Sequence, residues 1–259
     1  MNPMEQARTF RLPRLSAFAL HLIAMALMLG DHLWATFLPQ HDWLTAAGRL
    51  AFPIFAFLLV EGFCRTGDLK KYMQRLLLAA LVSEIPFNLI MSRRLTDPLH
   101  QNVLWSFLLS LLALSALKRM KDRPLWQRIP GSFLAVLAFY ALGFLTFVDY
   151  YGYGILTVVL FYLTRPGEDA SRGMRRVMMA VQAAALLWLN TEVMKGLQIP
   201  ITLFGTTFLF HRQGLAVLAL PLIWLYDGRQ GPHRPWIRWV FYLFYPVHLF
   251  LLGGLLAVL

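Results

Sequence analysis

The sequence predicts an all-α protein, a polytopic bundle of membrane-spanning helices. Hydrophobic residues make up 58% of the chain and charged residues only 14%, and the mean hydropathy is +0.57. Apolar segments of about 20 residues, the length that crosses a bilayer, recur from end to end. Because the connections between them are short, no stretch is left for a separate soluble domain. We therefore expect residues 1–259 to form one transmembrane domain.

Nine spans follow from the order of the apolar runs. Eight of the runs are bounded by polar or turn residues: Leu15–Leu38, Leu44–Phe63, Leu69–Met91, Leu104–Leu117, Phe133–Val148, Tyr153–Leu163, Val177–Asn190 and Trp236–Leu259. The ninth span is expected within Ile199–Tyr226, where four polar or small residues, His211–Gly214, interrupt the apolar pattern. This region holds either a re-entrant piece followed by one span or two short spans, and the second arrangement gives ten in total.

The distribution of positive charge favours nine spans with a cytoplasmic N-terminus, because cytoplasmic loops collect Lys and Arg. Ten spans would move the basic loop 229–238 to the outside. The nine-span arrangement places the following residues inside: Arg8, Arg11, Arg14, Arg65, Lys70, Lys71, Lys118, Arg119, Lys121, Arg123, Arg128, Arg165, Arg172, Arg175, Arg176, Arg229, Arg234 and Arg238. The formal charge of +11 is then explained by anionic lipid headgroups and anionic cytosolic ligands, without a nucleic-acid partner. We expect a multi-pass protein of the bacterial inner membrane.

Familiar soluble catalytic motifs are absent from the sequence. There is no nucleophile elbow, Walker loop or dinucleotide-binding glycine pattern. The histidines lack metal-ligand spacing, so no metal is expected. The single cysteine, Cys64, cannot close an internal disulfide, and its expected role is small-residue packing.

Ionisable and polar side chains instead gather at one expected depth, near the outer ends of five spans. Ionisable groups within a span are costly, so they usually mark function. The residues of this outer layer are Asp31, His32, Arg49, Glu84, Asn88, Gln101, Asn102, Asp149 and Tyr150. Each has a plainer alternative as an interfacial residue, a structural ion pair or a helix cap. Their common depth favours a functional site.

Helix geometry divides the roles of the adjacent pair Asp31 and His32. Neighbouring residues on a helix point about 100° apart, so the two side chains should have different partners. We expect His32 to face a cavity as general base and Asp31 to form an ion pair with Arg49, although Gly30 could loosen the turn enough to reverse this. Glu84 also needs a partner or a proton, and the candidate partners are Arg49, Arg75 and His32.

A second polar layer is expected at the cytoplasmic ends of the spans. Arg65, Lys70, Lys71 and Arg75 could bind the phosphates of a nucleotide-like donor. The inward bias of positive charge explains the same residues without a ligand.

Five segments together resemble the TraX family, in the family's order and across nearly the whole chain. They are Gly30–His32, Gly48–Phe57 running on to Glu61–Phe63, Ser83–Asn88, Gln101–Val103 and Phe241–His248. Family members are associated with N-terminal acetylation of conjugative pilin. The family is similar to a wider group of transmembrane acyltransferases, which use cytosolic acetyl-CoA to modify extracytoplasmic acceptors.

The resemblance implies acyl transfer from acetyl-CoA to an amine or hydroxyl of an acceptor protein, glycan or lipid. We assign catalysis to His32, Asp31 and Glu84, and donor binding to Arg65, Lys70, Lys71 and Arg75. Substrate binding is assigned to Arg49, Asn88, Gln101, Asn102, Asp149, Tyr150, Tyr245 and His248. Two other hypotheses stay open from the residues alone: a small proton-coupled transporter or exporter, and a non-enzymatic assembly factor.

Overall fold

A computed structural model describes residues 14–167, 169–232 and 234–258. The basic residues Arg8 and Arg11, the N-terminus itself and Leu259 lie outside the described residues. Helices account for most of the described chain: α1 (Ala17–Thr36), α2 (Asp42–Gly48), α3 (Ala51–Arg65), α4 (Leu69–Met91), α5 (Val103–Met120), α6 (Leu125–Leu145), α7 (Tyr151–Leu163), α8 (Arg172–Trp188), α9 (Ala219–Trp224) and α10 (Pro235–Val258).

Several helices begin where a polar side chain satisfies a free backbone N–H group of the first turn. The side chains of Ser16, Asp68, Asn102 and Ser171 cap α1, α4, α5 and α8 in this way. A π-helical turn, Leu189–Val193, continues α8, and a 3-10 segment, Arg212–Leu218, leads into α9. The sequence therefore contains local start signals for four of its helical runs.

Within the described residues, six helical stretches are long and apolar enough to cross a bilayer: Ala17–Thr36, Asp42–Arg65, Leu69–Met91, Val103–Met120, Leu125–Leu145 and Trp236–Leu256. Two shorter apolar stretches are Tyr151–Leu163 and Arg212–Trp224. The expectation of a polytopic helical protein is thereby supported at the level of six candidate spans. The total of nine stays a prediction.

The structure differs from one expected span and adds a break within another. The first half of the region Ile199–Tyr226 is not helical, because β1 (Gln198–Leu203) and β2 (Thr206–His211) pair there as an antiparallel hairpin. Its turn places Phe204 and Gly205 at φ of 50° and 78°, the positive values that a tight two-residue hairpin turn needs. The run Leu44–Phe63 is interrupted at Arg49 and Leu50, between α2 and α3.

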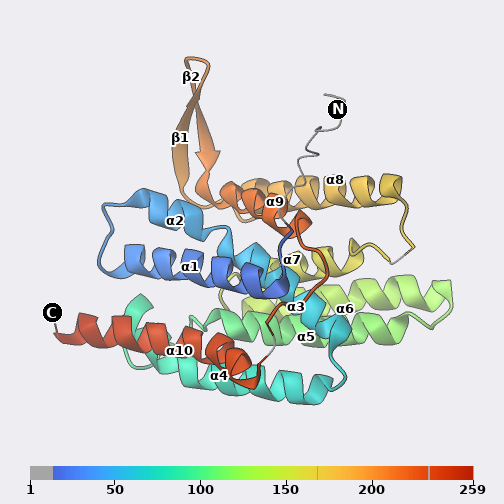
Figure 1. Cartoon of the computed structure of the whole chain (residues 1–259), viewed down its shortest axis with the longest axis horizontal. Coiled ribbons are helices and arrows are strands. Elements are labelled where there is room, and N and C mark those ends of the chain that lie inside the picture. The colour runs from blue at the N-terminus through green and yellow to red at the C-terminus, as the bar shows by residue number, and fades with distance from the viewer. Residues whose placement is uncertain (1–13, 168, 233, 259) are drawn as a thin grey trace, which may run out of the picture.

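The long helices lie roughly along one direction, and the hairpin projects across it (Figure 1). Helix α10 packs against both α1 and α4, and α3 packs against α1, α5 and α7. Most of α3 is buried, so it forms the centre of the apolar core.

Backbone hydrogen bonds join distant segments at each end of the bundle. At one end, Leu15 N–H donates to the Leu225 carbonyl at 2.9 Å, and Asp227 N–H donates to the Leu15 carbonyl at 3.0 Å. At the other end, Asp149 N–H donates to the Gln101 carbonyl at 2.8 Å. The start of α1 and the connection to α10 therefore share one end, and the connections before α5 and α7 share the opposite end.

Candidate functional site

Asp31 and Arg49 form an ion pair between α1 and the break that follows α2. The Nη2 atom of Arg49 lies 2.6 Å from each carboxylate oxygen of Asp31. The expected ion pair is confirmed. The close approach depends on Gly48, because a Cβ atom at that position would lie 2.5 Å from the Cβ of Asp31.

Further polar groups hold the guanidinium of Arg49 from its other sides. Its Nε donates to the Thr45 carbonyl at 3.2 Å, and its Nη1 donates to Oε1 of Gln213 at 3.3 Å. The Gln213 amide nitrogen donates in turn to Asn190 at 3.2 Å. Sequence reasoning missed Thr45, Gln213 and Asn190. The last two lie around the hairpin, about 165 and 140 residues away from Arg49 in the sequence, so no local pattern could have indicated them.

His32 and His248 form a buried pair between the first and last helices. Nδ1 of His32 lies 2.7 Å from Nε2 of His248. The Nδ1 atom of His248 lies 2.7 Å from the Phe244 carbonyl oxygen one turn earlier in α10. Both side chains are largely shielded from solvent. The pair places two residues of the predicted site in direct contact.

Glu84 has different partners from those expected. Its Oε2 atom accepts hydrogen bonds from Asn102 Nδ2 at 2.5 Å and from Trp105 Nε1 at 3.0 Å. The expectation of Arg49, Arg75 or His32 as its partner was wrong, because α4 turns this carboxylate toward the first turn of α5. Glu84 and Asn102 thereby join the two helices, and Asn102 also caps α5.

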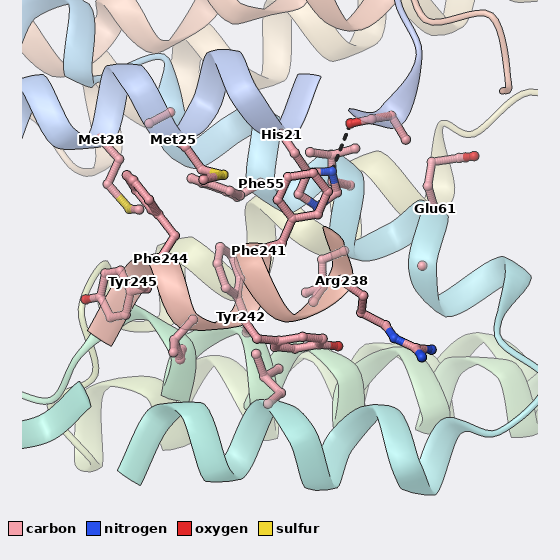
Figure 2. A pocket seen from close by; sticks show the side chains of 18 of the residues that line it. His21, Met25, Met28, Phe55, Glu61, Arg238, Phe241, Tyr242, Phe244 and Tyr245 are labelled. Carbon is pink, nitrogen blue, oxygen red and sulfur yellow. Dashed lines mark hydrogen bonds between the residues drawn. The ribbon is translucent and has the colours of Figure 1, made fainter. Parts of the chain in front are cut away.

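A cavity of about 430 Å³ runs between α1, α3 and α10. One stripe of α1 lines it, with His21, Met25, Met28 and His32 spaced by four, three and four residues. His21 and His32 are thus about 16 Å apart along the helix axis and on one face. In Figure 2, His21, Met25 and Met28 face Phe241, Phe244 and Tyr245 of α10. The cavity middle is apolar and aromatic.

Different polar groups line the two ends of this cavity. Near the end of α1 that carries Asp31 and His32, the lining includes Asp149, Tyr150 and Tyr245. Near the opposite end, four arginines line it: Arg65, Arg75, Arg234 and Arg238. Figure 2 shows Arg238 of α10 and Glu61 of α3 at this arginine-rich end. The cavity therefore joins the two polar layers expected from the sequence.

Two comparisons with known proteins match nearly the whole chain. The family model described as "TraX protein" matches residues 16–256. The chain belongs to the TraX family. It is also 32% identical over 250 residues to "Probable fimbrial assembly protein FimC, serogroup H1" of Dichelobacter nodosus, covering 92% of this chain and 94% of that protein. No solved structure matches. Family membership confirms the resemblance found in the sequence.

The structure brings together seven of the residues predicted for the site of this TraX protein. The residues that line the cavity are Asp31, His32, Arg65, Arg75, Asp149, Tyr150 and Tyr245. Burial raises the pKa of the Asp149 carboxyl above its usual range, an effect that His100 and Arg49 oppose. Tyr150 has a φ of 61° and stacks on Phe52 with the ring centroids 3.9 Å apart. Phe52 and Tyr150 both line the cavity, so this stacked pair forms part of its wall.

Other predicted residues of this TraX-family chain lie away from the described cavity lining. Gln101 donates from its side chain to the Asp97 carbonyl at 3.1 Å, within its own loop. Asn88 is buried on α4. Lys71 pairs with Asp68 at 3.2 Å, and Lys70 lines a separate surface groove between α4 and α5. Helix periodicity turns Lys70 away from Arg75, which lines the cavity, whereas Lys71 lies one turn before Arg75 and pairs with Asp68 instead.

A buried carboxylate organises the arginine-rich end of the cavity. Glu61 accepts hydrogen bonds from Arg65 Nε at 3.0 Å and from Arg165 Nε at 2.7 Å. Arg65 also donates to the Gly228 carbonyl at 2.6 Å. Burial, together with the negative charge of Glu61, raises the pKa of Tyr226 to about 12. Arg234 and Arg238, which the sequence analysis assigned only to a loop, take the place at the cavity that was expected for the two lysines.

Proposed function

We propose that this TraX-family chain is a membrane-embedded acyltransferase that moves an acetyl group from cytosolic acetyl-CoA to an amine or hydroxyl. The observation that carries the proposal is the cavity that joins an arginine-rich end to the Asp31 and His32 end. A donor with an anionic nucleotide and a long, mostly uncharged arm has the same division of charge. An imidazole at the far end is suited to accept a proton from the nucleophile.

The donor's phosphates are proposed to bind Arg75, Arg234 and Arg238. Arg65 already has two partners, Glu61 and Gly228, so its contribution is to shape this end. Guanidinium groups bind phosphate through paired, charge-assisted hydrogen bonds. The apolar stripe between His21 and His32 would hold the arm and bring the thioester carbonyl near His32.

Transfer at this end would proceed by direct attack on the thioester. As the acceptor nitrogen or oxygen forms a bond to the carbonyl carbon, its proton passes to His32. The carbon–sulfur bond then breaks, and the sulfur leaves as the thiol after it takes that proton back. The Asp31 carboxylate would hold Arg49 in place beside this centre, and the phenol of Tyr150 or Tyr245 would supply a hydrogen bond to the carbonyl oxygen.

The acceptor is proposed to be an extracytoplasmic or membrane-borne group. The relative from Dichelobacter nodosus is named a probable fimbrial assembly protein. We infer that a pilin N-terminus is the first acceptor to test, followed by glycans and lipids. This places the Asp31 and His32 end toward the outside and the arginine-rich end toward the cytoplasm, in a bacterial inner membrane with nine spans and a cytoplasmic N-terminus.

The test is release of free thiol from acetyl-CoA by the full chain in detergent or lipid nanodiscs, with membrane extract as the source of acceptors. We expect turnover by the wild-type chain and loss of about 100-fold or more in His32→Ala, the range expected for removal of a general base. The matched control is His41→Ala, since His41 is an exposed residue at the start of α2. Absence of thiol release by the wild type, or equal rates in both variants, would refute the proposal.

A further inference from the structure

The contact between His32 and His248 joins residues 216 positions apart in the sequence. The two imidazole planes are within 15° of parallel, and the ring centroids are 5.0 Å apart. This arrangement lets the hydrogen bond lie nearly in the plane of both rings. His32 lines the cavity, and among the described residues His248 lies behind it rather than in the cavity lining.

The partners of His248 determine which nitrogen of each ring carries a proton. The Phe244 carbonyl oxygen can only accept a hydrogen bond, so Nδ1 of His248 must be the donor. A neutral imidazole carries one N–H proton, so Nε2 of His248 is an acceptor. The 2.7 Å contact then requires Nδ1 of His32 to donate. The lone pair of His32 is therefore on Nε2, the ring nitrogen that takes no part in the contact with His248.

We propose that His248 is a positioning residue that holds His32 in the tautomer whose Nε2 atom can accept a proton. The inference rests on the proposed acyl transfer, in which that atom is the general base. Neighbouring charged groups leave this arrangement intact, because Asp31 binds Arg49 through both carboxylate oxygens. The other titratable ring beside the pair is Tyr245, whose centroid lies 6.2 Å from that of His32.

During transfer, the acceptor's proton would move to Nε2 of His32 and give an imidazolium ion. The bond from Nδ1–H of His32 to Nε2 of His248 then strengthens, because its donor is charged. The same proton leaves Nε2 for the sulfur of the departing thiol, so the pair returns to its starting state. His248 acts through His32 and does not touch the reacting atoms.

Two substitutions at position 248 separate positioning from packing. His248→Gln keeps an acceptor at about the distance of the lost Nε2 atom, whereas His248→Phe keeps an aromatic ring and removes the acceptor. We expect His248→Phe to lower kcat by about 10–100-fold, by analogy with the loss of a hydrogen-bond partner that orients a metal-bound imidazole. KM for acetyl-CoA should change by less than about twofold. His248→Gln should restore most of kcat.

Nitrogen NMR of the chain labelled with 15N-histidine provides a readout independent of activity. The chain has seven histidines, and His32→Asn and His248→Gln identify the two pairs of signals. We expect a protonated Nδ1 and an unprotonated Nε2 for His32 in the wild type, kept in His248→Gln and lost in His248→Phe. A protonated Nε2 in wild-type His32, or equal kcat in the Gln and Phe variants, would overturn the inference.

The two proposals can fail separately. If the wild type releases no thiol, acyl transfer is refuted, and the tautomer of His32 is still decided by its nitrogen signals. If thiol release is normal but the signals show the other tautomer, acyl transfer stands and the role of His248 is refuted.

Discussion

Single side chains at the arginine-rich end of the cavity have unequal freedom to bind a ligand. Arg65 and Arg165 share the carboxylate of Glu61. Arg75 lies over the ring of Tyr242, with its guanidinium carbon 5.8 Å from the ring centroid. Arg238 lies one turn before Tyr242 on the same face of α10 and lines the cavity. Phosphate binding should therefore depend more on Arg238 than on Arg65.

We predict that Arg238→Ala weakens acyl-CoA binding about tenfold, which corresponds to one charge-assisted hydrogen bond of about 1.4 kcal/mol. Isothermal titration of the full chain in detergent measures the dissociation constant. Lys70→Ala is the matched control, because Lys70 is an exposed cation that was also predicted to bind the donor but lines a different groove. Equal affinities of the two variants would remove Arg238 from the donor site.

The contact between α1 and α2 shows how one small residue places a charged pair. Asp31 and Arg49 meet because Gly48 lets the two helices approach. A side chain at Gly48 would push on the Cβ of Asp31, which is part of α1 and cannot rotate away. Gly30 offers a matched comparison, since a Cβ there would lie at an ordinary 3.5 Å from Leu44.

We predict that Gly48→Ala destabilises the chain by about 1–3 kcal/mol, the usual effect of overpacking a buried contact. Gly30→Ala should leave stability within about 1 kcal/mol of wild type, since alanine favours helix. Thermal unfolding in one detergent compares the two variants. If Gly48→Ala is as stable as Gly30→Ala, the close approach of α1 and α2 does not constrain the site.

The loop between α4 and α5 contains a carboxylate with a pH-dependent role. Hydrogen bonds from the Ser92 hydroxyl and from the Leu99 N–H lower the pKa of Asp97. A lowered folded-state pKa means that the ionised carboxylate stabilises the loop above the unfolded pKa. This stabilisation is lost as the pH falls through the folded pKa, below about pH 4.

We predict that amide hydrogen exchange in residues 92–101 becomes faster, relative to its intrinsic rate, when the pH falls from 5 to 3. Asp97→Asn should remove this dependence, because an amide cannot ionise. Hydrogen–deuterium exchange with mass spectrometry measures the exchange rates of the wild type and of Asp97→Asn. A pH dependence that persists in Asp97→Asn would assign the effect to another group.

Local patterns predicted the helices of this chain better than its breaks. The runs that became α1, α4 and α10 were long, apolar and bounded by polar residues. The hairpin at 198–211 was missed, because a short apolar run with β-branched residues does not distinguish a strand from a buried helix. The break at Arg49 was missed although it has a local signal, because Pro53 in the first turn of α3 has no N–H to donate to the Arg49 carbonyl four residues earlier.

Some contacts of the candidate site could likewise be predicted from the sequence, and others could not. The Asp31–Arg49 pair was predictable because the two residues are close in sequence and at one expected depth. The partners of Glu84 were not, since the rotation of α4 about its axis decides them. The contact of His32 with His248 depends on how α10 packs against α1, which no sequence spacing records.

At the scale of the whole molecule, the two ends of the bundle should face opposite sides of the membrane. From the order of the spans, the hairpin turn should lie on the same side of the membrane as Asp149. Residues 121–124 connect α5 to α6 at the other end of the bundle. We predict that Thr206→Cys in a Cys64→Ser background reacts with an impermeant maleimide on intact spheroplasts. Asp122→Cys should react only after permeabilisation. Labelling of both cysteines in intact cells would contradict nine spans with a cytoplasmic N-terminus.

Under the proposed acyl transfer, the separation of His32 and His248 along the chain also decides when during synthesis the general base becomes functional. His32 enters the membrane with α1, and its partner follows 216 residues later, in α10. Until α10 inserts beside α1, His32 has no acceptor for its Nδ1 proton. A nascent or truncated chain thus lacks the completed pair, which links chemical competence to completion of the bundle.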